Sequence, residues 1–291
     1  MARQTGRTWG AVLSRGGKGW YLCGMERDML HLGDCMEGLR SLPDGSVDAV
    51  ITDPPYGITC CKWDVRPDLP ALFSELWRVL KPNGAIAMFA QQPFATDCIN
   101  ASRREFRYDW VWEKTAARGF LNANRMPLRC HEDVLMFYRH IPTYNPQMAK
   151  GKPYEMDQGY CGTIYRKREK RVHTINDGTR YPRDVIRFKD ATPSVAHGSV
   201  GRGNATTNGT AVPNIHPTQK PLPLLEYLIK TYTNEGDLVV DPYMGSGTTA
   251  VAALRTGRHF IGWEKEGDYH AKALARIEAA RAELAGKGDT P

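Results

Sequence analysis

An apolar run that ends in two consecutive prolines constrains the fold of this chain more than any other feature. Residues 47–52 (Val-Asp-Ala-Val-Ile-Thr) are mostly β-branched or small and apolar, which is typical of a buried strand. The next four residues are Asp53, Pro54, Pro55 and Tyr56. A proline pair ends a strand, because proline lacks the N–H that a sheet needs. The sequence therefore predicts a carboxylate and an aromatic ring at the carboxyl end of a strand, where open α/β sheets bind their ligands.

These residues suit the methylation of an exocyclic amino group on a planar base. Such an amine is a poor nucleophile, because its lone pair is delocalised into the ring. Asp53 and the carbonyl of Pro54 would each accept one N–H, which draws the nitrogen toward tetrahedral geometry and stabilises the developing positive charge. Tyr56 offers a ring on which a flipped-out base can stack. The alternative is a strand that ends in a turn with a solvated carboxylate.

A second predicted strand is followed by a glycine-rich turn. Residues 237–241 (Asp-Leu-Val-Val-Asp) lead into 242–249 (Pro-Tyr-Met-Gly-Ser-Gly-Thr-Thr). Gly245 and Gly247 permit positive φ and close approach of a ligand to the backbone. The next apolar run ends at Glu264, about 20 residues later, where a Rossmann-like unit places its acceptor for ribose hydroxyls. A P-loop is rejected, because no lysine follows the second glycine.

Taken together, these segments resemble the β class of DNA amino-methyltransferases, circularly permuted enzymes that use S-adenosylmethionine. In that class the catalytic segment precedes the target-recognition region, and the glycine loop that binds the cofactor follows it. The matching segments are 31–34 (His-Leu-Gly-Asp) leading into 53–56, then 216–221 (His-Pro-Thr-Gln-Lys-Pro), 241–249, and 261–264 with Tyr269. With their flanking elements they span most of residues 28–140 and 214–280.

The resemblance implies a role for each matching position. Asp53 and Pro54 would bind the target amine, Pro55 belongs to the same catalytic segment, and Tyr56 would stack on the base. The residues implied for the cofactor site are Asp34, Cys35, Asp53, Thr218, Lys220, Asp241, Tyr243, Gly245, Ser246, Gly247, Thr248 and Glu264.

Within this set, each segment is expected to contact a different part of the cofactor. The segment of Asp34 and Cys35 would contact the adenine ring. The segment of Thr218 and Lys220 would hold the carboxylate, and Glu264 would accept from the ribose hydroxyls. Lys220 also makes sense on its own, because it lies just before a predicted helix start at which an anion can bind.

The alternation of strands and helices predicts a doubly wound, Rossmann-like α/β sheet with helices on both faces. The predicted strands are 29–32, 47–53, 85–90, near 108–114, 134–138, 237–241 and 259–264. The predicted helices are 36–41, 69–80, around 94–103, 222–230 and about 269–283. The helix over 69–80 is expected to stop at 81–84 (Lys-Pro-Asn-Gly). Residues 112–114 (Trp-Glu-Lys) and 131–132 (His-Glu) fall on predicted strands without a definite role.

Nearly all of the excess positive charge lies in one quarter of the chain. Residues 141–215 hold 12 Lys and Arg against 6 Asp and Glu, while the whole chain carries +7. Cations that neutralise phosphates, with aromatic side chains interleaved, are typical of duplex binding. We therefore expect 141–190 to form much of a recognition region for double-stranded DNA. Its densest contacts are expected from Arg166, Lys167, Arg168, Lys170 and Arg171.

The chain is thus expected to divide into four parts. These are a basic N-terminal arm (1–27), a catalytic half (28–140), a target-recognition insertion (141–215) and a cofactor-binding half (216–291). Within the insertion, 191–214 is rich in Gly, Ser, Thr and Asn, which suits either a mobile loop that closes over a ligand or a plain linker.

Composition fits a cytoplasmic enzyme. No apolar run approaches the length of a membrane span, and the first 25 residues lack the apolar core of a secretory signal. The seven cysteines include no C-x-x-C pair, which indicates reduced thiols rather than disulfides or a zinc site. The resemblance further implies a bacterial or phage-encoded protein and a two-fold homodimer.

The first residue of the catalytic segment bears on which base is modified. Asp53 resembles enzymes that methylate adenine at N6, whereas many enzymes that methylate cytosine at N4 have Ser there. We therefore expect adenine, with cytosine as the alternative. An RNA amino-methyltransferase and a DNA-binding descendant without catalysis are further alternatives. Glutamine-methylating enzymes fit less well, because their segment opens with Asn and their glycine loop comes first.

Overall fold

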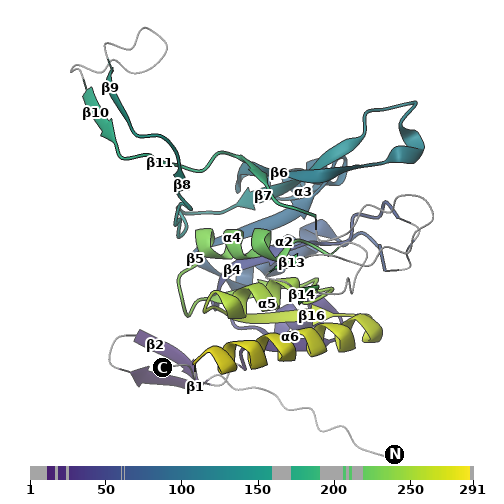
Figure 1. Cartoon of the computed structure of the whole chain (residues 1–291). Coiled ribbons are helices and arrows are strands. Elements are labelled where there is room, and N and C mark those ends of the chain that lie inside the picture. The colour runs from purple at the N-terminus through teal and green to yellow at the C-terminus, as the bar shows by residue number, and fades with distance from the viewer. Residues whose placement is uncertain are drawn as a thin grey trace, which may run out of the picture.

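An eight-stranded sheet forms the centre of the protein, in the strand order β12-β6-β7-β5-β4-β15-β16-β3 (Figure 1). The computed structural model describes residues 12–16, 19–23, 26–59, 61, 63–158, 172–190, 206–207, 210–211 and 219–288. The strands of the sheet are β3 (Met29–Leu32), β4 (Val47–Thr52), β5 (Leu80–Ala90), β6 (Phe106–Arg118), β7 (Arg129–Phe137), β12 (Val185–Arg187), β15 (Leu238–Asp241) and β16 (His259–Glu264).

Strand direction decides which residues meet at each edge of this sheet. β7 is antiparallel to β5 and β6, and every other neighbouring pair is parallel. The carboxyl ends of β3, β4, β5, β15 and β16 therefore lie at one edge. Because β7 runs the opposite way, it brings its amino-terminal end to the same edge.

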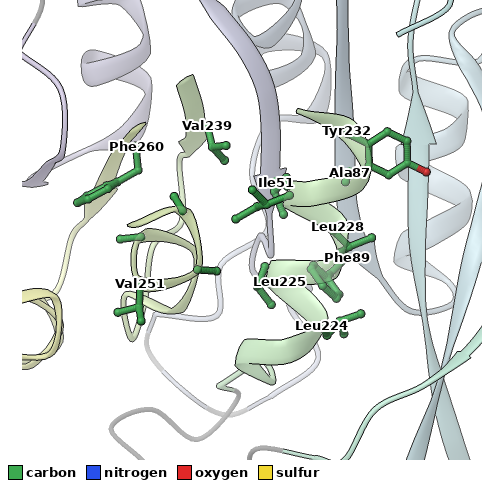
Figure 2. Close-up of a cluster of buried hydrophobic side chains, with 14 of the residues drawn as sticks. Ile51, Ala87, Phe89, Leu224, Leu225, Leu228, Tyr232, Val239, Val251 and Phe260 are labelled. Atoms are coloured by element: carbon green, nitrogen blue, oxygen red, sulfur yellow. The ribbon is translucent and has the colours of Figure 1, made fainter. Parts of the chain in front are cut away.

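The two faces of the sheet bury separate apolar cores, as the alternation along β5 requires. Ala85, Ala87 and Phe89 face a core covered by α4 (Leu222–Tyr232), α5 (Thr248–Arg255) and α6 (Gly267–Gly288). Figure 2 shows side chains of β4 and α4 together in this core. Ile86 and Met88 face the second core, which is covered by α1 (Cys35–Ser41), α2 (Leu69–Val79) and α3 (Phe94–Ala101). The predicted α/β sheet with helices on both faces is confirmed.

The segment 81–84 was expected to separate a helix from a strand, and this expectation is wrong. α2 ends at Val79, but β5 begins at Leu80 and includes Pro82 and Gly84. The pairing of β5 with β4 shifts register between Val47 and Ala49, and such an irregularity accommodates a residue without an N–H. At Gly84 a Cβ would lie 2.7 Å from a backbone oxygen of β4, so glycine permits the close approach of the two strands.

Part of the predicted insertion belongs to the central sheet. β12 pairs in parallel with β6 and forms the outer edge of the sheet. Before it, β8 (Ala149–Lys150) pairs with β11 (Thr179–Arg180), and β9 (Tyr154–Gln158) pairs with β10 (Val172–Asn176). The β9–β10 hairpin projects away from the sheet at the upper left of Figure 1. Two short hairpins, β1 (Val12–Gly16) with β2 (Gly19–Cys23) and β13 (Thr206–Thr207) with β14 (Thr210–Ala211), complete the described strands. Among the described helices, none is long and apolar enough to cross a membrane.

Candidate active site

A cavity of about 940 Å³ opens at the carboxyl edge of the sheet. Most residues predicted for the site line it, although they come from five separate stretches of the chain. They are Asp34, Cys35, Asp53, Pro54, Pro55, Tyr56, Lys220, Asp241, Tyr243, Gly245, Ser246, Thr248 and Glu264. Thr218 lies outside the described residues, as do Arg166, Lys167, Arg168, Lys170 and Arg171.

Gly247 is the one described residue of the predicted set that does not line the cavity. Its φ of 74° places it in the left-handed region at the start of α5, and a Cβ there would lie 3.3 Å from Ala273 of α6. Gly245, with φ 54°, does line the cavity. The two glycines of the turn therefore differ in what they do: one faces the cavity, and the other permits the helix start and its packing.

The catalytic segment places a carboxylate at the end of β4. The hydroxyl of Tyr56 donates a hydrogen bond of 2.7 Å to Oδ1 of Asp53, and the Tyr56 ring stacks on Phe94 with 5.1 Å between centroids. Phe94 fixes the ring from one side, so Tyr56 orients the carboxylate as well as lining the cavity. Sequence reasoning assigned only the stacking role to this tyrosine.

The loop after Tyr56 is held by a residue that sequence reasoning missed. The Asp64 carboxylate accepts hydrogen bonds from three successive backbone amides, those of Gly57, Ile58 and Thr59, at 2.7–2.9 Å. Burial by itself would raise the pKa of Asp64, but these bonds and one from the Thr59 side chain lower it. No pattern in the sequence marks this contact, because Asp64 is one of several acids near the prolines.

Lys220 lies inside the cavity wall rather than in solvent. Only 9% of its surface is exposed, and its Nζ lies 2.5 Å from Oδ2 of Asp53. Burial alone would lower the pKa of Lys220, but the charges of Asp53 and Glu132 outweigh it and raise that pKa. Burial raises the pKa of Asp53, while the Lys220 ammonium opposes the rise. The two side chains are thus an ion pair before any ligand binds.

Glu132 joins this pair to a second lysine. It lies at the amino-terminal end of β7, where it accepts from Lys114 of β6 and from Nε2 of Gln91 at 3.0 Å. Its Oε2 is buried and accepts no hydrogen bond from the described residues, although Nζ of Lys220 lies 3.4 Å away. Burial would raise the pKa of Glu132, but the two lysines lower it. The result is an alternating row of two carboxylates and two ammonium groups.

Asp241 connects the two halves of the site. Its carboxylate accepts from Thr52 at 2.8 Å, the last residue of β4, and from Thr249 at 2.7 Å in α5. It also accepts from the backbone N–H of Tyr243 at 3.0 Å. Because the group is buried, its pKa rises to about 6 although these three donors oppose the rise.

The predicted cofactor acids also shape the backbone around them. The side chain of Asp34 caps α1 by accepting from the N–H of Met36 at 2.8 Å. Glu264 accepts from the N–H of Gly245 at 2.9 Å and from that of Glu266 at 2.8 Å. Its carboxylate therefore ties the end of β16 to the glycine turn.

A partly buried arginine supports the glycine turn from behind. Nη1 of Arg276, on α6, donates to the carbonyl of Ser246 at 3.0 Å and to the hydroxyl of Thr248 at 2.8 Å. Burial lowers the pKa of Arg276 to about 10, and no carboxylate pairs with it among the described residues. Sequence reasoning gave Arg276 no role, because it lies about 30 residues beyond the turn on a helix with charges on its outer face.

Comparison with known protein families identifies the family to which this chain belongs. Residues 47–275 match the family described as DNA methylases, the N6 and N4 methyltransferases. The chain belongs to this DNA methylase family. The matched range includes the catalytic segment, Lys220, the glycine turn and Glu264.

Individual relatives agree with this assignment. This DNA methylase is 30% identical over 258 residues to the type II methyltransferase M.BglII of Bacillus subtilis, a match that covers 82% of this chain and 66% of that protein. It resembles the crystal structure of the M1.HpyAVI–SAM complex with a TM-score of 0.55 and 24% identity, over 85% of this chain and 98% of that one. It also resembles the cytosine-N4-specific PvuII DNA methyltransferase, with a TM-score of 0.57 and 19% identity over 87% and 89% of the two chains. These two likenesses establish the fold.

Proposed function

We propose that this protein transfers the methyl group of S-adenosylmethionine to the exocyclic N6 of a flipped-out adenine at specific sites in duplex DNA. The observation that carries the proposal is the shared wall of one cavity: Asp53 and Tyr56 lie on it together with the glycine turn and Glu264. A target amine and a methyl donor can thus meet in one space. The cavity of about 940 Å³ is large enough for both.

The residues that fit the cofactor are the cavity-lining glycine turn, Asp34 and Glu264. Gly245 has no side chain that would block a ligand, and a Cβ built there meets nothing closer than 3.9 Å. Glu264 supplies carboxylate oxygens at the distance along the chain that a ribose acceptor has. The bound sulfonium would supply an electrophilic methyl group.

On the acceptor side, Asp53 and the Pro54 carbonyl are the two acceptors for the amine of the base. Bound S-adenosylmethionine would supply a methyl group to this nitrogen, and its sulfur would keep the electron pair of the broken carbon–sulfur bond. The nitrogen then loses one proton. Since burial raises the pKa of Asp53, this carboxylate is a better acceptor for that proton than a solvated aspartate is.

The deciding experiment is mass spectrometry of nucleosides from unmethylated duplex DNA incubated with the protein and S-adenosylmethionine. N6-methyladenine is the expected product. N4-methylcytosine would keep the mechanism and correct the base. An unmodified DNA pool, with methylated RNA in a parallel competition, would reject DNA as the substrate.

We further propose that residues 141–190 contribute much of the DNA-binding surface, with Arg166, Arg168 and Arg171 at phosphates. Reversing these three charges should weaken DNA binding and flatten its salt dependence, because each lost phosphate contact removes roughly one unit of slope. Reversing Arg103 and Arg104 is the control, since both are exposed near the start of β6, at the opposite edge from the cavity. Unchanged DNA affinity in the triple variant would reject the assignment.

A further inference from the structure

The β6–β7 hairpin extends past the cavity and carries an apolar tip. The two strands pair from Phe106 with Phe137 as far as Arg118 with Arg129, and the hairpin projects at the right of Figure 1. Lys114 and Glu132, one from each strand, line the cavity. The tip, residues 119–128, therefore begins just beyond the wall of the active site.

Large apolar side chains at this tip are exposed to solvent. Leu121 is 89% exposed, Phe120 70% and Met126 54%. Gly119, with φ 88° in the left-handed region, starts a short 3-10 turn over Phe120–Asn122 that presents these side chains. Several exposed apolar side chains gathered on one projection indicate a binding surface rather than chance exposure.

The charge of the hairpin identifies the kind of partner. Between Thr115 and Cys130 the chain contains three arginines and no acidic residue. Arg125 is exposed, and Arg129 is exposed and donates to the neutral side chain of Gln91 at 2.5 Å. Neither cation is in an ion pair with an acid of the described residues, so both charges are available to a polyanion.

We propose that residues 119–128 form an apolar wedge that enters the DNA duplex beside the target base and fills the space that the flipped base leaves. Leu121 and Phe120 replace the stacking contacts of that base, while Arg125 and Arg129 contact the flanking phosphates. The proposal rests on the proposed function, because a wedge is needed only where a paired base must leave the helix.

The test compares two duplexes that both contain the recognition site. This site is mapped beforehand by sequencing DNA that the wild-type protein has methylated. In one the target base is paired, and in the other it faces an abasic position, where extrusion costs less. The variant is Leu121→Ala combined with Phe120→Ala. Ile141→Ala is the matched control, because Ile141 is 87% exposed but follows the end of β7 at the opposite edge of the sheet.

We expect the double variant to lose about tenfold or more in single-turnover rate on the paired duplex, since the cost of unstacking the base is no longer offset by side chains that fill its place. On the abasic duplex it should lose about twofold or less, with unchanged affinity for S-adenosylmethionine. Equal losses on both duplexes, or no loss on the paired one, would overturn the wedge. If the wild-type protein methylates neither duplex, the proposed function fails instead, and the wedge is rejected with it.

Discussion

Lys220 and Asp53 are 167 residues apart in the chain, yet the ammonium nitrogen of one lies 2.5 Å from a carboxylate oxygen of the other. The second oxygen of Asp53 accepts from Tyr56. Both oxygens are thus occupied before a base arrives. Each carboxylate oxygen has two lone pairs, so an incoming amine can bind beside these partners without displacing them. The pair fixes the carboxylate in place and compensates its charge.

Replacing Asp53 with Ala should remove the acceptor for the amine. We expect the rate of methyl transfer to fall by about a hundredfold or more, which is the usual loss when a transition-state contact is deleted. Affinity for S-adenosylmethionine, measured by calorimetry, should change little. Asp44→Ala is the control, since Asp44 is exposed and, among the residues that the structure describes, pairs only with Arg78. Full activity in Asp53→Ala would contradict the mechanism.

Replacing Lys220 with Met should make the reaction more sensitive to acid. Burial already raises the pKa of Asp53, and removing the ammonium that opposes the rise should raise it further. The carboxylate is then ionised only at higher pH, so activity relative to wild type should increase as pH rises. Single-turnover rates across a pH series measure this, and Lys220→Arg should restore part of the loss at low pH. A pH-independent ratio would argue against the pairing.

The buried carboxyl of Asp241 should make the free energy of unfolding depend on pH. Its folded pKa of about 6 exceeds the ordinary 3.8, so the folded state binds more protons between these values and stability falls as pH rises through them. Relative to Asp241→Asn, which does not titrate, the wild-type free energy of unfolding should fall by about 1 kcal/mol from about pH 5 to about pH 8. Urea denaturation of both proteins measures the difference. A constant difference would mean that the carboxyl titrates normally.

Arg276 should matter for cofactor affinity rather than for the chemical step. Arg276→Met removes the donors to Ser246 and Thr248 and loosens the glycine turn. We expect the KM for S-adenosylmethionine to rise by roughly tenfold, the equivalent of about one hydrogen bond to a charged group, with kcat nearly unchanged. Arg281→Met, five residues further along α6, tests the effect of losing a charge from the same helix. A fall in kcat without a change in KM would contradict this role.

The elements that sequence reasoning located well are those with strong local patterns. β3 has the predicted bounds of Met29–Leu32, and α2 falls one residue short of its predicted end, because strand-like and helical apolar spacing is visible in a few residues. β6 and β7 are longer than predicted, since 115–118 and 129–133 include polar residues and lack the continuous apolar run by which a strand is recognised.

The contacts within the site were less accessible to sequence reasoning. The row from Asp53 through Lys220 and Glu132 to Lys114 joins three distant segments, and its order depends on the reversed direction of β7. From the sequence, Lys220 was expected to bind the carboxylate of the cofactor. In the structure it is buried beside the carboxylates of Asp53 and Glu132, which are its partners within the protein. Long-range pairing of this kind leaves no periodic trace in a single sequence.

Asp241 ends β15, and its carboxylate binds both Thr52, the last residue of the adjacent strand β4, and the first turn of α5, although Thr52 and Asp241 are 189 positions apart in the chain. Alignment of the two half-sites is therefore a property of neighbouring strands and not of the polypeptide that links them. A chain cut between the halves and rejoined through its original ends would keep the same bond. The order in which a gene encodes the two halves therefore changes the connectivity of the chain but not the geometry of this site.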